Sequence, residues 1–171
     1  MRNSYAILTT DAFILHTRGI GEADRMITVL TRENGVLDVY ARSIRKETAK
    51  MRGAVKPYGQ VRLSLIQGKK NILKDITVTD TLDAVWNEQR KYKAYVILLR
   101  HIHTLVPAVS EEDESLFSIA QTAVQLLQQS DDNLADHILL VAQVLVLNAL
   151  SQTHPTPVSY THLTLPTILL V

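Results

Sequence analysis

The hydrophobic pattern of the chain changes once, near residue 80, and this change limits the folds available to it. Before that point, short segments are rich in β-branched, aromatic and leucine residues. After it, apolar residues recur at helical spacing. Asn34-Gly35 separates two of the short segments and predicts a tight hairpin with positive φ at both residues. The predicted strands are 12–17, 26–31, 36–41, 61–66 and 72–79.

Five strands in about 80 residues indicate a small closed or nearly closed barrel. The fourth strand alternates strictly. Val61, Leu63 and Leu65 are expected to face one side, and Arg62 and Ser64 the other.

Three helices are predicted in the second half, the first ending at Pro107 and the last near Leu150. The last is apolar on almost every face and needs neighbours all round, so the helical domain is expected to be incomplete. Its most apolar run, Ile138–Leu150, is predicted to be a buried helix too short for a bilayer. Candidate caps are Ser110 and Asp113 for the second helix, and Asp131 and Asp132 for the third.

Charge divides the chain at the same place. Residues 1–80 hold 14 Lys or Arg against eight Asp or Glu, whereas residues 81–171 hold four against nine. The densest basic segment, Ala41–Gly53, is typical of a polyanion-binding surface. A solvated surface loop is the alternative, and the cluster alone leaves both open. Its cations are Arg42, Arg45, Lys46, Lys50 and Arg52.

Several other kinds of site are disfavoured. The sequence has no cysteine, which excludes disulfides and thiolate metal sites. Gly19 and Gly21 lack the third glycine of a dinucleotide loop, and His101 and His103 cannot share a helix face. No catalytic serine–histidine–acid set is evident, so we predict no enzyme, cofactor or metal. With no signal-peptide pattern at the N-terminus, a cytoplasmic protein without a membrane role is expected.

The last residues have a separate origin in our interpretation. Pro157–Thr167 (PVSYTHLTLPT) is similar to a translated sequencing-library adapter of the transposase type. We therefore expect residues 157–171 to be non-native and the natural chain to be interrupted near Thr156. An apolar terminal strand is the alternative.

An ordered series of segments lies between Ala12 and Gly59. An apolar strand leads into RGIGEADR, a second ends in TRENG, and a third enters the basic segment before GAVKPY. This series resembles the N-terminal domain of the RecO family, the bacterial recombination mediators. The resemblance covers roughly residues 1–156, because the helical pattern from Leu82 fits as well.

The resemblance implies an α+β protein, in which a five-stranded OB-fold barrel over residues 1–80 precedes a partial α-helical domain over 81–156. Members of the family bind single- and double-stranded DNA and anneal strands coated with single-strand-binding protein. They work with RecR to load RecA in DNA damage repair and recombination. Many carry a cysteine zinc motif further along, which is absent here.

Single-strand binding on an OB-fold combines a cationic groove with aromatic faces. The basic segment and Lys56 are predicted to supply the groove. Tyr40 and Tyr58 are candidate stacking residues, with barrel core as the alternative for each. Arg18 and Arg25 are predicted to extend the surface, and Glu22 and Asp24 either temper them or pair with them to fix the turn.

We thus predict a DNA-binding mediator. The rival is an OB-fold protein-interaction module with no nucleic-acid role, in which the basic loop is incidental.

Overall fold

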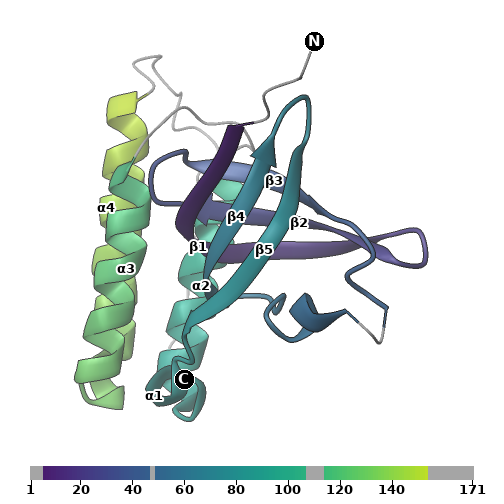
Figure 1. The fold of residues 1–171 in the computed structure, drawn as a ribbon. Helices are drawn as coiled ribbons and strands as arrows, with labels where there is room; N and C mark the ends of the chain where they lie inside the picture. The colour runs from purple at the N-terminus through teal and green to yellow at the C-terminus, as the bar shows by residue number, and fades with distance from the viewer. Residues whose placement is uncertain (1–5, 47–48, 107–113, 154–171) are drawn as a thin grey trace.

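A five-stranded barrel lies beside a group of helices in the computed structural model (Figure 1). The structure describes residues 6–46, 49–106 and 114–153. The capping box at Ser110 and Asp113 and the adapter-like tail therefore lie outside the described residues. The strands are β1 (Ala6–Ile20), β2 (Asp24–Thr31), β3 (Val36–Ala41), β4 (Gln60–Gln67) and β5 (Asn71–Asp80).

The barrel closes in the order β1-β2-β3-β5-β4. β1 pairs antiparallel with both β2 and β4, and β3 meets β5 in parallel over two residue pairs, Val39–Asn71 and Tyr40–Ile72. This is the five-stranded barrel of the OB-fold, so the predicted fold class is confirmed. All five predicted strands are present.

The alternation predicted for β4 is also confirmed, since Val61, Leu63 and Leu65 are at most 1% exposed inside the barrel. The β2–β3 hairpin differs from the prediction, because only Gly35 of the dipeptide has a positive φ (60°). The connection holds four residues, and Thr31 closes it by donating from its backbone N–H to the Gly35 carbonyl at 2.8 Å. A connection of this length needs only one left-handed residue.

β1 is buried on both faces over its central part. Ala12 and Ile14 face the barrel interior, whereas Phe13 and Leu15 belong to a cluster shared with the helices. A register shift between Ile14 and His16 marks a bulge in this strand. The helices are thus packed on the outer face of the barrel against the middle of β1.

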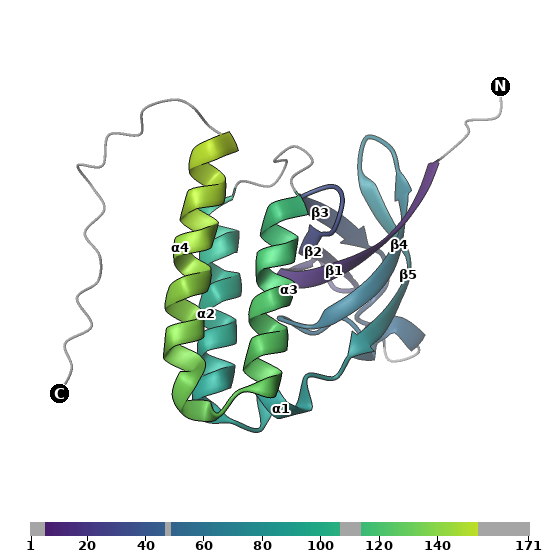
Figure 2. The same ribbon diagram turned by 90° about the vertical axis from the view of Figure 1, so that its left-hand side faces the viewer.

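The helices form a second layer. α2 contacts β1, α3 contacts β2, and α4 packs on both α2 and α3 on the side away from the barrel (Figure 2). The predicted helices are confirmed, with a short extra helix before them. The helices are α1 (Asp83–Trp86), α2 (Gln89–Leu105), α3 (Glu114–Gln129) and α4 (Ala135–Thr153); two 3₁₀ turns, η1 (Lys50–Gly53) and η2 (Asp132–Leu134), lie outside them.

The predicted caps of the third helix are wrong. Asp131 precedes η2 and its side chain makes no capping bond. The Asp132 carboxylate instead accepts the backbone N–H of Lys91 at 3.3 Å in the first turn of α2, where a negative charge is favourable.

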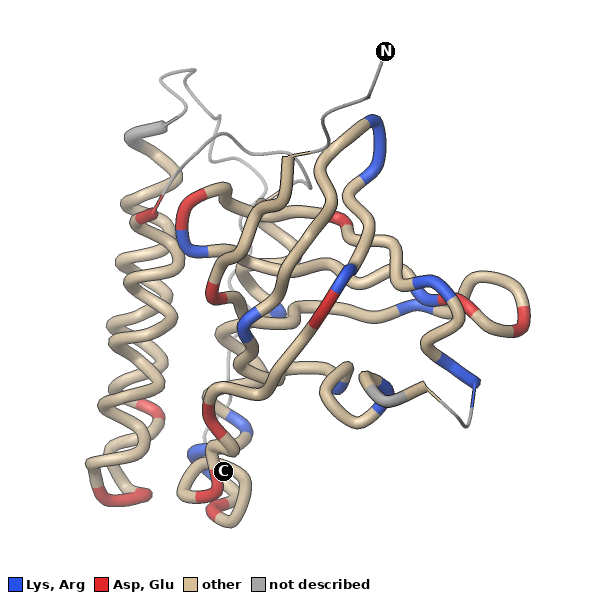
Figure 3. Tube along the Cα trace, viewed as in Figure 1, with Lys and Arg blue, Asp and Glu red and all other residues tan. Residues whose placement is uncertain are grey.

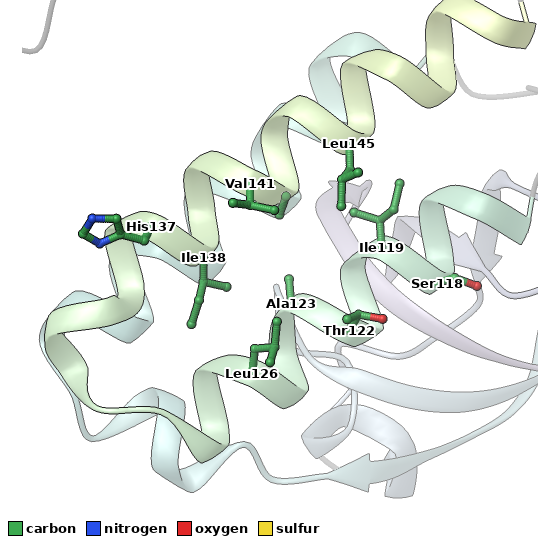
Figure 4. A pocket seen from close by; sticks show the side chains of 10 residues that line it. Ser118, Ile119, Thr122, Ala123, Leu126, His137, Ile138, Val141 and Leu145 are labelled. Atoms are coloured by element: carbon green, nitrogen blue, oxygen red, sulfur yellow. The ribbon is translucent and has the colours of Figure 1, made fainter.

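The prediction of a buried last helix holds for one face of α4 only, in line with the expectation that the helical domain is incomplete. Val146 is 1% exposed against the other helices, but Leu140 is 61% and Val144 57% exposed. A groove of about 360 Å³ lies between α3 and α4, with Ile119 and Val141 on opposite walls (Figure 4). Residues 132–151 are long and apolar enough to cross a membrane by length and composition, a test that a core helix of a soluble protein also passes. Ile138–Leu150, the run predicted to be too short for a bilayer, lies within this longer stretch.

Candidate nucleic-acid interface

Most of the predicted cations gather at the end of the barrel formed by the β1–β2 hairpin and the β3–β4 connection (Figure 3). Lys50 begins η1 within that connection. Five of the predicted cations are exposed and make no side-chain hydrogen bond or ion pair with another described residue. They are Arg18, Arg42, Lys46, Arg52 and Lys56.

Arg45 holds the β1–β2 turn. Its backbone N–H donates to the Ala23 carbonyl at 2.9 Å, and its guanidinium donates to the Gly21 carbonyl at 2.9 Å. The guanidinium also lies over Gly19, where a Cβ would come within 3.2 Å of it. Arg45 is therefore exposed but already engaged with the backbone of the neighbouring turn.

Arg25 is engaged as well. It is half-buried, and its guanidinium donates to the Val55 carbonyl at 3.3 Å. This contact ties β2 to the β3–β4 connection. Among the described residues, neither Arg25 nor Arg18 forms an ion pair with Glu22 or Asp24.

Asp24 fixes the start of the basic segment instead. It accepts hydrogen bonds from the Tyr40 hydroxyl and from the Ser43 backbone N–H. The Tyr40 hydrogen bond, followed by the Ser43 bond, lowers the pKa of Asp24, and Arg42 and Lys46 act in the same direction. The same hydrogen bond raises the pKa of Tyr40. Tyr40 is half-buried on the barrel surface, with its hydroxyl anchored.

Tyr58 has different surroundings. It takes a positive φ of 63°, and its backbone N–H donates to the Ile14 carbonyl at 2.8 Å. Its carbonyl accepts the hydroxyl of Tyr95 in α2 at 2.6 Å, and its side chain packs against the cluster shared with the helices. The structure thus places Tyr58 where the barrel meets α2, apart from the site at Tyr40.

Tyr40 lines a surface groove of about 250 Å³ on the β2–β3 face, which we call the β2–β3 groove. Met26 forms part of its wall, and the β4–β5 loop supplies Lys69 and Lys70, both exposed. Both lysines lie between the predicted strands 61–66 and 72–79 and were not among the predicted DNA-binding residues. The signal that could have found them is the OB-fold itself, which binds oligonucleotides on this face and with this loop. The lining residues are Met26, Leu37, Asp38, Tyr40, Gly68, Lys69, Lys70 and Asn71.

Residues 1–85 match the family model described as "Recombination protein O N terminal". The chain is 31% identical over 124 residues to a DNA repair protein RecO of Pelotomaculum thermopropionicum, covering 71% of this chain and 47% of that protein. It is 37% identical over 73 residues to the protein of that name from Heliobacterium modesticaldum, covering 43% of this chain and 26% of the relative. A RecO of Nocardioides sp. is 30% identical over 111 residues, or 63% of this chain and 45% of the relative. The matched part of the chain spans about half, or less, of each relative's length. Together with the closed OB barrel, these matches place the chain in the RecO family.

Proposed function

We propose that this chain binds single-stranded DNA along the β2–β3 groove and acts as a non-catalytic mediator of recombinational DNA repair. The observation that carries the proposal is the groove itself, in which Lys69, Lys70 and the anchored ring of Tyr40 meet on the binding face of an OB barrel. Lysines attract the phosphates, and an aromatic ring gives a base a face on which to stack.

The exposed cations at the end of the barrel extend this surface. Arg42 directly follows β3, the strand that carries Tyr40, and Lys46 lies four residues further along the chain. A strand of DNA leaving the groove along β3 would meet them next. Arg52 and Lys56 lie further along the same connection, in the proposed DNA-binding domain of residues 1–80.

Annealing follows from the same charges. Neutralising phosphates lowers the repulsion between two strands and lets base pairing proceed. We propose that the protein anneals complementary strands, binds double-stranded DNA too, and helps load the recombinase. Single-strand-binding protein, RecR and RecA are the proposed partners, in the cytoplasm and at the nucleoid of a bacterium.

The test is the salt dependence of binding to a fluorescent oligothymidine, measured by anisotropy. Removing one lysine that binds a phosphate should reduce the slope of log K against log salt by roughly 0.7. Replacing Lys69 and Lys70 by alanine should therefore reduce it by about 1.4. Lys93→Ala is the matched control, since Lys93 is an exposed lysine on α2.

A second variant tests the end of the barrel. Arg42, Lys46 and Arg52 are replaced together by alanine, and Arg45 is kept because it holds the β1–β2 turn. Binding should weaken equally for all sequences, because phosphate contacts carry no base information. If DNA affinity did not depend on salt concentration, or if the unmodified chain did not bind DNA, the alternative of a protein-interaction module would be favoured.

A further inference from the structure

Two histidines from different parts of the fold stack on one another. The ring centroids of His16 in β1 and His103 in the last turn of α2 are 5.2 Å apart, with 28° between the ring planes. His16 is exposed and His103 half-buried. The proposed function makes no use of this pair, which we call the histidine pair.

A row of paired residues connects the histidine pair with the β2–β3 groove. His16 pairs with Thr28 across β1 and β2, and Thr28 pairs with Asp38 across β2 and β3. The Thr28 hydroxyl donates to the Asp38 carboxylate at 2.7 Å. Asp38 lines the groove together with Lys69 and Lys70, and it is the acidic member of that lining.

The charged groups that act on His103 among the described residues are His16 and Asp38. Burial, followed by the neighbouring His16, lowers the pKa of His103, while Asp38 opposes this effect. A lowered pKa leaves His103 uncharged at neutral pH. The negative charge of Asp38 is then not balanced by the histidine beside it.

We propose that the histidine pair sets the charge of the β2–β3 groove, with His103 taking up a proton when DNA occupies the groove, so that binding tightens as the pH falls. This inference rests on the proposed function. An imidazolium beside Asp38 would offset the carboxylate that otherwise repels phosphates. The phosphates in turn would stabilise the imidazolium, and this mutual effect is required by linkage.

The direction and the size of the pH dependence of DNA affinity follow from that linkage. DNA raises the pKa of His103 from its value in the free protein, so affinity grows as the pH falls between the two values and is constant outside them. A rise of one unit corresponds to about a tenfold gain in affinity. We expect a gain of about three- to tenfold between pH 8 and pH 6 at constant ionic strength.

The experiment measures oligothymidine affinity from pH 8.5 to pH 5.5 for the unmodified chain and for His103→Gln. His137→Gln is the control, because His137 is exposed on α4 by the groove between α3 and α4. The control should keep the pH dependence, and His103→Gln should lose most of it. The Asp38→Asn variant should bind oligothymidine more tightly than the unmodified chain at pH 8, and its affinity should depend less on pH.

The direct readout is an NMR titration of the His103 ring, whose pKa should rise when DNA is added. An unchanged pKa, or equal pH dependence in the unmodified chain and in His103→Gln, overturns this inference alone. Failure of the unmodified chain to bind DNA at any pH overturns the proposed function instead. Circular dichroism of each variant confirms that it is folded.

Discussion

Replacing Tyr95 by phenylalanine should weaken the attachment of the helices to the barrel. Tyr95 is fully buried, and its hydroxyl donates to the Tyr58 carbonyl at 2.6 Å. Burial raises the pKa of Tyr95, so the hydroxyl keeps its proton throughout the working range. Phenylalanine fills the same space but leaves the carbonyl without this donor.

Because this hydrogen bond is partly buried, the expected cost of losing it is about 0.5–1.5 kcal/mol in the free energy of unfolding. For a chain of this size, each kcal/mol lowers the melting temperature by about 2–4 °C. Urea unfolding followed by far-UV circular dichroism measures the change. The slope of the free energy of unfolding against urea concentration should stay the same, because the variant exposes no additional surface on unfolding.

Two control variants isolate the hydrogen bond. Tyr58→Phe keeps the accepting carbonyl and should cost little. Tyr92→Phe removes the hydroxyl of an exposed tyrosine on the same helix, with no hydrogen bond to another described residue. A loss below about 0.5 kcal/mol in Tyr95→Phe, or an equal loss in Tyr92→Phe, would refute the assignment of this bond as a structural link.

Two further predictions concern stability. Tyr40→Phe should raise the pKa of Asp24 toward its ordinary value, measured by NMR. Because the pKa of Asp24 is lowered in the folded protein, Asp24 stabilises the fold at any pH above its unfolded-state pKa. This stabilisation is lost as the pH falls through the folded-state pKa. Tyr40→Phe should therefore lose less stability in acid than the unmodified chain. Val146→Ala should cost about 2 kcal/mol in urea unfolding, and Val144→Ala, on the exposed face of the same helix, almost nothing. Equal losses would contradict the packing of α4.

The secondary structure was predictable because it depends on local pattern. Strict alternation in β4 and helical spacing after residue 80 are properties of neighbouring residues, and both appear in the structure. The sequence also indicated that α4 needs neighbours on every side and that the other helices are too few to cover it, and part of α4 is exposed in the structure. Which face of α4 remains exposed was not predictable, because a helix with apolar residues all round does not show in its sequence which side its neighbours cover.

The candidate site was predictable only in part, because a charge count does not show what each charge contacts. Arg45 belongs to the basic segment in sequence but is bound to the Gly21 carbonyl in the structure. Lys69 and Lys70 lie almost 30 residues from Tyr40 along the chain, and the barrel brings them together by pairing β3 with β5. The resemblance implied the OB-fold, but local spacing could not show this pairing.

The short pairing of β3 with β5 has a consequence for local opening of the barrel. The other strand pairs share six to eight residue positions, whereas these two share only Val39–Asn71 and Tyr40–Ile72. Few backbone bonds must break to part them, and regions of that kind open with the lowest free energies. Amide hydrogens of Asn71 and Ile72 should therefore exchange with deuterium faster than those in the middle of β4. Because this seam borders the β2–β3 groove, DNA spanning it would slow that exchange.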